Sequence, residues 1–113
     1  HAMQRIYARL ADGFDALDAV AAVFPPGSVT GAPKVRAMEV IHELEPVPRG
    51  VYCGSLGWLG QQTLELNGAI RTITFAENTA HVPVGAGIVM GSQPAREFEE
   101  TELKAVRMLG ALC

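Results

Sequence analysis

Two carboxylates and a lysine lie on one flank of the helix predicted for residues 94–112. Glu97, Glu100 and Lys104 are spaced i, i+3 and i+7, so helical geometry places the two carboxyl groups within about 6 Å of each other at Cβ. Neighbouring carboxylates repel unless a cation neutralises them, and Mg²⁺ is typically held by one or two carboxylates together with substrate oxygens. Lys104 can offset charge or donate a proton. An ordinary solvated helix face with a Glu–Lys ion pair is the alternative interpretation.

A second candidate group is the cation of Arg71. The pattern predicts a strand over residues 63–75, in which Arg71 shares a face with Ile73 and Phe75. A charge on an apolar strand face needs an anionic partner. Arginine favours planar, bidentate recognition of carboxylates, so both a core salt bridge and a substrate clamp fit this position.

Two glycine-containing segments offer backbone N–H groups to an anion. Residues 27–34, GSVTGAPK, fail as a phosphate loop because the gap between the glycines is three residues and Val35 stands where Ser or Thr should bind Mg²⁺. Free N–H groups and two hydroxyls before a helix still suit a carboxylate, although a tight interhelix turn explains them equally well. Gly85 and Gly87 allow close approach of a ligand or mark a bulge.

The elements that must position these residues comprise four predicted strands and three predicted helices. The turn between the second and third strands is predicted at residues 60–62, in preference to a hairpin turn at Asn67-Gly68. The predicted order is β-α-α-β-β-β-α, an α+β fold with a mainly antiparallel sheet and helices on one side. The strands are predicted over residues 4–10, 51–59, 63–75 and 79–90, and the helices over residues 15–24, 33–44 and 94–112.

Composition limits the remaining possibilities. The 113 residues indicate one small domain, and the net charge of −3 gives no basic patch for nucleic acid or an anionic membrane. The apolar stretches are too short to span a bilayer. Cys53 and Cys113 do not suggest a disulfide framework, which favours a reduced, cytoplasmic protein. Residues 1–3 are interpreted as a tag remnant or start, and residues 4–113 as the folded portion.

Five ordered motifs together resemble the C-terminal part of the chorismate-utilising enzymes. This family includes anthranilate synthase component I, aminodeoxychorismate synthase component I, isochorismate synthase and salicylate synthase. Aminodeoxychorismate synthase component I, of the para-aminobenzoate branch of folate synthesis, is the most similar subgroup, and the anthranilate branch is its nearest rival. The motifs are FPPGSVTGAPKVRAMEVIHELEP (24–46), RGVYCGSLGWLG (49–60), AIRT (69–72), GAGIV (85–89) and EFEETELKA (97–105).

The resemblance implies a role for each matching position. Glu97 and Glu100 match an acidic pair at a Mg²⁺ site, with Glu100 the direct ligand, and Lys104 matches an active-site lysine. Tyr52 and Arg71 match residues that contact the enolpyruvyl carboxylate of chorismate. Gly85 and Gly87 match backbone donors to the substrate, and Ser28 matches a loop hydroxyl that contacts it.

The resemblance also implies a larger parent protein. Family members are several times longer, and their upstream part carries a further metal carboxylate and the nucleophilic lysine of the aminodeoxychorismate subgroup. We therefore expect residues 4–113 to be part of a chorismate-binding catalytic domain that makes 4-amino-4-deoxychorismate with ammonia from a glutamine amidotransferase subunit. The segment alone should be inactive. A self-associating, non-enzymatic piece and a small metal- or anion-binding module are the alternatives.

Overall fold

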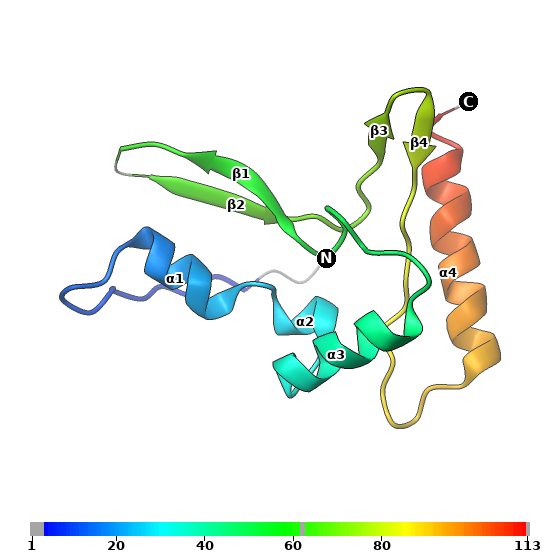
Figure 1. Cartoon of the computed structure of the whole chain (residues 1–113), viewed down its shortest axis with the longest axis horizontal. Helices are drawn as coiled ribbons and strands as arrows, with labels where there is room; N and C mark the ends of the chain where they lie inside the picture. Colours follow the sequence, from blue (N-terminus) through cyan, green and yellow to red (C-terminus); the bar gives the residue numbers. More distant parts are fainter. Residues whose placement is uncertain (1–3, 62, 113) are drawn as a thin grey trace.

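A computed structural model describes residues 4–61 and 63–112 (Figure 1). The predictions for residues 1–3, for Gln62 within the turn and for Cys113 lie outside this part of the chain. The α+β class is confirmed. The elements are α1 (Ala16–Val23), α2 (Gly27–Thr30), α3 (Lys34–Leu44), β1 (Ser55–Leu59), β2 (Leu64–Gly68), β3 (Thr74–Ala76), β4 (Thr79–His81) and α4 (Pro94–Leu109).

The helix predicted over residues 15–24 forms as α1, and Asp15 caps its start. The Asp15 side chain accepts from the N–H groups of Leu17 and Asp18, and Asp18 accepts from the N–H of Asp15, which completes a capping box. Two expectations around this helix were wrong. Residues 4–10 form no strand because they pair with no other described segment, and Ile6 is 87% exposed. The predicted loop over residues 27–32 contains a helical turn, α2.

The central hairpin has the predicted turn. β1 and β2 pair antiparallel from Ser55↔Gly68 to Leu59↔Leu64, and the Gly60 N–H donates to the Thr63 carbonyl at 2.8 Å. A Cβ at Gly57 would lie 1.8 Å from the Glu65 carbonyl oxygen, so the close approach of the strands requires glycine there. The predicted strand over residues 51–59 starts later, because residues 51–54 form a turn.

The two long strands predicted after this turn are interrupted. β2 ends at Gly68, and Arg71 has a positive φ of 50°, a left-handed conformation that cannot continue a strand. β3 pairs only with β4 among the described strands, so the chain forms two separate two-stranded sheets in place of the one predicted sheet. Beyond β4 the predicted strand fails, since Pro83 lacks an N–H for a ladder.

The last helix runs beside the irregular segment that follows β4 (Figure 1). Lys104 of α4 joins the two with a hydrogen bond to the Gly85 carbonyl. The helix has Pro94 in its first turn, as predicted. It ends at Leu109, three residues before the predicted end, where Gly110 and the residues after it form a turn.

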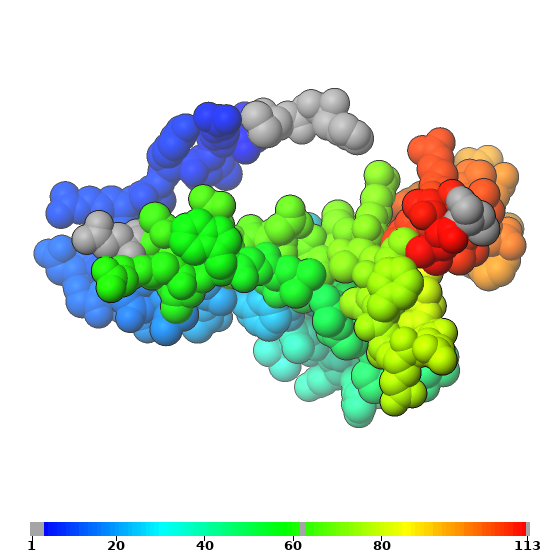
Figure 2. Space-filling model, turned by 90° about the horizontal axis from the view of Figure 1, so that it is seen from above, coloured from blue at the N-terminus to red at the C-terminus, as the bar shows by residue number. Residues whose placement is uncertain are grey.

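The described residues bury very little apolar surface. Their buried hydrophobic residues are Cys53, Ala69 and Met108. The radius of gyration is 16.5 Å, whereas a compact domain of 100 residues has about 13 Å. The space-filling view shows α4 at one end, and α1 together with the tip of the β1–β2 hairpin towards the other (Figure 2). Across residues 4–61 and 63–112, no helix has the length and apolar character needed to cross a membrane.

Candidate functional site

Lys104 makes two polar contacts on the inner side of α4. Its Nζ donates to Glu100 Oε1 at 2.5 Å and to the carbonyl oxygen of Gly85 at 2.8 Å. The Lys104 side chain is 30% exposed and that of Glu100 is 52% exposed. The spacing along the helix explains the first contact, but only the tertiary fold explains the second. Lys104 therefore attaches the segment after β4 to the helix that carries the two carboxylates.

Tyr52 approaches the same segment from the turn before β1. A Cβ placed on Gly85 would lie 2.7 Å from the Tyr52 hydroxyl oxygen, so the absence of a side chain at Gly85 makes room for the phenol. Burial and the neighbouring Cys53 thiol raise the pKa of Tyr52 above its usual value, while Arg49 opposes the shift. The hydroxyl of a tyrosine is protonated at neutral pH, and the upward shift favours the same state, so it can donate a hydrogen bond.

Arg71 reaches the site from a turn and not from the predicted strand. The Ile70 N–H donates to the Gly68 carbonyl at 2.8 Å, which bends the chain directly before Arg71. Arg71 lines a cavity of about 250 Å³ in which three cationic side chains surround one carboxylate. An excess of positive charge in a partly enclosed space favours an anion. The lining residues are Arg71, Glu100, Leu103, Lys104 and Arg107.

Glu97 and Glu100 provide an incomplete set of metal ligands. Glu97 lies in the first turn of α4, three residues before Glu100, and Glu100 is already paired with Lys104. Within the described part of the chain, no group of three or more His, Cys, Asp or Glu residues is placed to hold a metal ion. Two carboxylates nevertheless match the chemistry of Mg²⁺, which completes its coordination with water and substrate oxygens.

Ser28 and Gly87 are not brought to this cavity. Ser28 is exposed in α2, where Thr30 donates its hydroxyl to the Pro26 carbonyl at 3.0 Å. Gly87 is also exposed, and a Cβ there would meet nothing within 4 Å. Neither residue lines the described cavity, and Tyr52, Gly85 and Glu97 do not line it either. Their predicted contacts to substrate therefore remain predictions.

Sequence reasoning missed one cationic residue of the cavity that helical spacing points to. Arg107 lies three residues after Lys104 and seven after Glu100, so it shares the flank of α4 on which Glu100 and Lys104 were found. The same periodicity, extended by one turn, would have included it. Arg49 was also missed, because its contacts with the turn that carries Tyr52 arise only in the folded chain.

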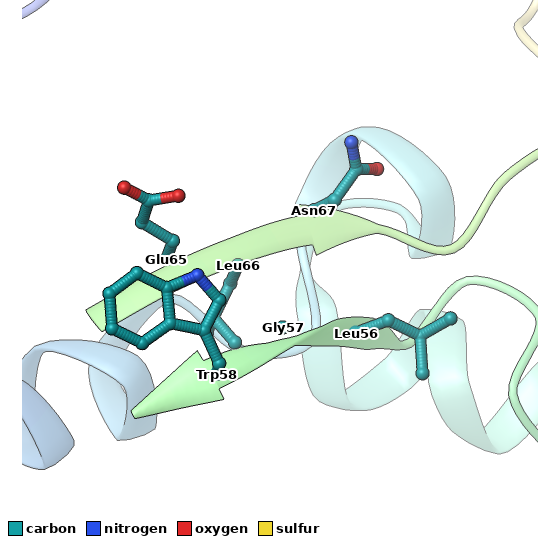
Figure 3. Close-up of a pocket in the computed structure, with 6 residues that line it drawn as sticks. All are labelled: Leu56, Gly57, Trp58, Glu65, Leu66 and Asn67. Carbon is teal, nitrogen blue, oxygen red and sulfur yellow. The ribbon is translucent and has the colours of Figure 1, made fainter. Parts of the chain in front are cut away.

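A second cavity lies on the β1–β2 hairpin and contains none of the predicted site residues. It measures about 300 Å³ and is lined by Leu56, Gly57, Trp58, Glu65, Leu66 and Asn67. Trp58 and Glu65 occupy paired positions of the two strands (Figure 3). Trp58 is 53% exposed, so it lies on the surface of this chain.

Comparisons with known proteins agree with the resemblance drawn from the motifs. Aminodeoxychorismate synthase component 1 of Bacillus subtilis is 48% identical over 99% of this chain and 24% of its own length. Anthranilate synthase component 1 of Streptomyces coelicolor is 50% identical over 99% of this chain and 22% of its own. Anthranilate synthase component 1 of Aquifex aeolicus is 44% identical over 99% of this chain and 23% of its own length.

The chain thus spans about a quarter of the length of these curated relatives. The family model described as chorismate binding enzyme matches residues 1–110. A match over nearly the whole chain agrees with all five motifs and with a cavity suited to an anion. The chain therefore belongs to the chorismate binding enzyme family.

Proposed function

We propose that this chain forms one wall of the active site of an aminodeoxychorismate synthase component I. The parent enzyme would convert chorismate and ammonia to 4-amino-4-deoxychorismate. The observation that carries the proposal is the cavity where Arg71, Lys104 and Arg107 surround Glu100. Chorismate is a dicarboxylate, and a cavity with more cations than carboxylates suits a doubly negative molecule.

The proposed binding residues approach the substrate from three segments. Arg71 is assigned to a substrate carboxylate, because its guanidinium can form two parallel hydrogen bonds to one. Tyr52 contributes a protonated hydroxyl beside Gly85. Lys104 is assigned to charge balance and proton donation, and its bond to the Gly85 carbonyl keeps these groups together.

Glu97 and Glu100 are assigned to Mg²⁺. When bound, the metal ion supplies charge stabilisation to the carboxylate of the substrate and to the departing hydroxyl. Glu100 accepts from Lys104 through Oε1, which leaves its second oxygen for another partner. Further ligands must come from the substrate, from water or from residues outside the described chain.

Amination at C4, with ammonia from a glutamine amidotransferase subunit, is the favoured chemistry. It is supported by the motifs and by the similarity to the Bacillus subtilis aminodeoxychorismate synthase component 1. Anthranilate synthesis is the second candidate, because the Streptomyces coelicolor anthranilate synthase component 1 is as similar to this chain. Isochorismate formation is the third. The three reactions share the anion-binding wall and differ in product.

Product identification with the full-length protein tests the proposal. The protein is incubated with chorismate, ammonium and Mg²⁺, and the products are compared with authentic standards by chromatography and mass spectrometry. We expect 4-amino-4-deoxychorismate. Anthranilate or isochorismate would replace this assignment with the corresponding alternative, and absence of any chorismate-derived product would refute all three.

A further inference from the structure

Arg49 makes four kinds of contact beside Tyr52. Its Nε and Nη2 donate to the Glu45 carboxylate, the shortest distance being 2.6 Å. Its Nη1 donates to the Val29 carbonyl at 2.9 Å and to the Cys53 sulfur at 3.3 Å. The guanidinium carbon lies 5.6 Å from the centroid of the Tyr52 ring, within the range of a cation–π contact.

These contacts join three segments at one side chain. Val29 belongs to α2, Glu45 caps the end of α3, and Cys53 follows Tyr52 in the turn before β1. The Arg49 side chain is 24% exposed. A planar guanidinium can donate to Glu45, Val29 and Cys53 at the same time, because its donors are spread over three nitrogens. The donors of a lysine all lie on one nitrogen. The bond to Glu45 raises the pKa of Arg49 above its usual value.

We infer that Arg49 is a positioning residue that holds the Tyr52 ring so that the Tyr52 hydroxyl lies against Gly85. The inference rests on the proposed function and adds a positioning residue to the same site. Neither Arg49 nor Tyr52 lines the cavity. The Tyr52 hydroxyl lies beside Gly85, whose carbonyl accepts from the cavity residue Lys104, and Arg49 contacts this site through the Tyr52 ring. Its cation–π contact fixes the ring, while its bonds to Val29 and Glu45 fix the guanidinium.

Arg36 provides a matched control on α3. It forms ion pairs with Glu39 and Glu43, but its side chain is 62% exposed. An exposed ion pair on a helix contributes little to stability. Arg36→Met therefore removes another arginine that forms ion pairs with glutamates, without touching Tyr52.

The first test is kinetic and uses the full-length enzyme with chorismate and ammonium. We expect Arg49→Met to raise KM for chorismate on the order of 10- to 100-fold and to change kcat less, because Tyr52 is assigned to binding and not to the reacting carbon. Arg49→Lys should give a smaller increase, and Arg36→Met none. In a Tyr52→Phe background, Arg49→Met should add little. An equal effect in both backgrounds would mean that Arg49 does not act through the hydroxyl, which would overturn the inference.

The second test observes the ring without any substrate. Fluorotyrosine is incorporated at position 52 of the full-length protein, and its ¹⁹F signal is titrated with pH. The groups that face Tyr52 are Arg49, Cys53 and Glu45. If Arg49 positions the ring, Arg49→Met releases the ring from its buried place, and its pKa falls towards the ordinary value. If the ring stays in place, loss of the cation raises the pKa further, and the inference is wrong.

The two tests separate failure of the inference from failure of the proposed function. A protein that does not turn over chorismate refutes the proposed function, but its ¹⁹F titration still decides the role of Arg49. If Arg49→Met does not fold, Arg49→Lys takes its place, since it keeps the charge and loses the forked contact. The kinetic criterion is unchanged, and in the ¹⁹F titration the pKa should fall if the ring is released, whereas an unchanged pKa would contradict the inference.

Discussion

Glu100 is the residue on which most of the proposed chemistry converges. It lines the cavity, accepts from Lys104 and lies three residues after Glu97 on α4. Helical periodicity predicted its pairing with Lys104 correctly. The same periodicity could not reveal that Lys104 also bonds to Gly85, because that partner lies 19 residues away and no local pattern connects the two.

Replacing Glu100 by glutamine tests the metal assignment. Glu100→Gln keeps the size of the side chain but removes its charge, so we expect Mg²⁺-dependent turnover of the full-length enzyme to fall by about 100-fold or more. Glu102→Gln is the control, because Glu102 is an exposed carboxylate elsewhere on α4. Steady-state rates across a Mg²⁺ titration measure both. Unchanged turnover by the Glu100 variant would remove this residue from the metal site.

Replacing Gly85 by alanine tests the packing of the Tyr52 hydroxyl. The new methyl group of Gly85→Ala would lie 2.7 Å from that oxygen, so the ring must move, and we expect KM for chorismate to rise about tenfold, equivalent to about 1.4 kcal/mol. Gly91→Ala is the matched control, since a Cβ there meets nothing within 4 Å. Equal KM values for the two variants would contradict the contact between Tyr52 and the substrate.

At the scale of elements, short-range signals were reliable and pairing was not. The helix starts near residues 15 and 33 and the turn after β1 are local features, and each was predicted at or near its observed place. The long strands predicted over residues 63–75 and 79–90 failed, because a strand also needs a partner along its length. The left-handed Arg71 interrupts the first of them. The alternation of polar and apolar residues that predicts a strand cannot reveal a residue with a left-handed conformation.

The β1–β2 hairpin depends on one close approach of its strands. A Cβ in Gly57→Ala would lie 1.8 Å from the Glu65 carbonyl oxygen, so the strands must separate, and we expect a loss of stability of about 1–3 kcal/mol. Gly68→Ala, in which the Cβ meets nothing within 4 Å, should cost less. Chemical denaturation of the full-length variants compares the two. Equal stability would show that the hairpin tolerates the added methyl group.

The whole molecule leaves much apolar surface uncovered. Trp58 is 53% exposed, Phe75 is 71% exposed and Ile88 is 74% exposed. Each of the two sheets has two strands, so each has two unpaired edges within the described chain. Large apolar patches and free edges favour association with other chains or segments. The motifs indicated the family but not this exposure, which depends on tertiary contacts.

The 113-residue chain by itself should therefore associate and lack synthase activity. We expect its apparent mass in light scattering or sedimentation to rise with concentration, because association covers the exposed side chains. We expect no turnover with chorismate, ammonium and Mg²⁺. A strictly monomeric chain at high concentration would contradict the first expectation, and measurable turnover would contradict the second.

The buried thiol of Cys53 can report how often the turn beside Tyr52 opens. Cys53 is 6% exposed and lies against Arg49, so a thiol reagent can reach it only when this turn opens. In a Cys113→Ser background, Cys53 is the single cysteine of the 113-residue sequence. Its labelling rate then counts the openings, and we expect Arg49→Lys to accelerate labelling while Arg36→Met leaves the rate unchanged. If chorismate binds to Tyr52, it should slow the labelling of Cys53. The labelling rate of Cys53 would then report whether the site is occupied.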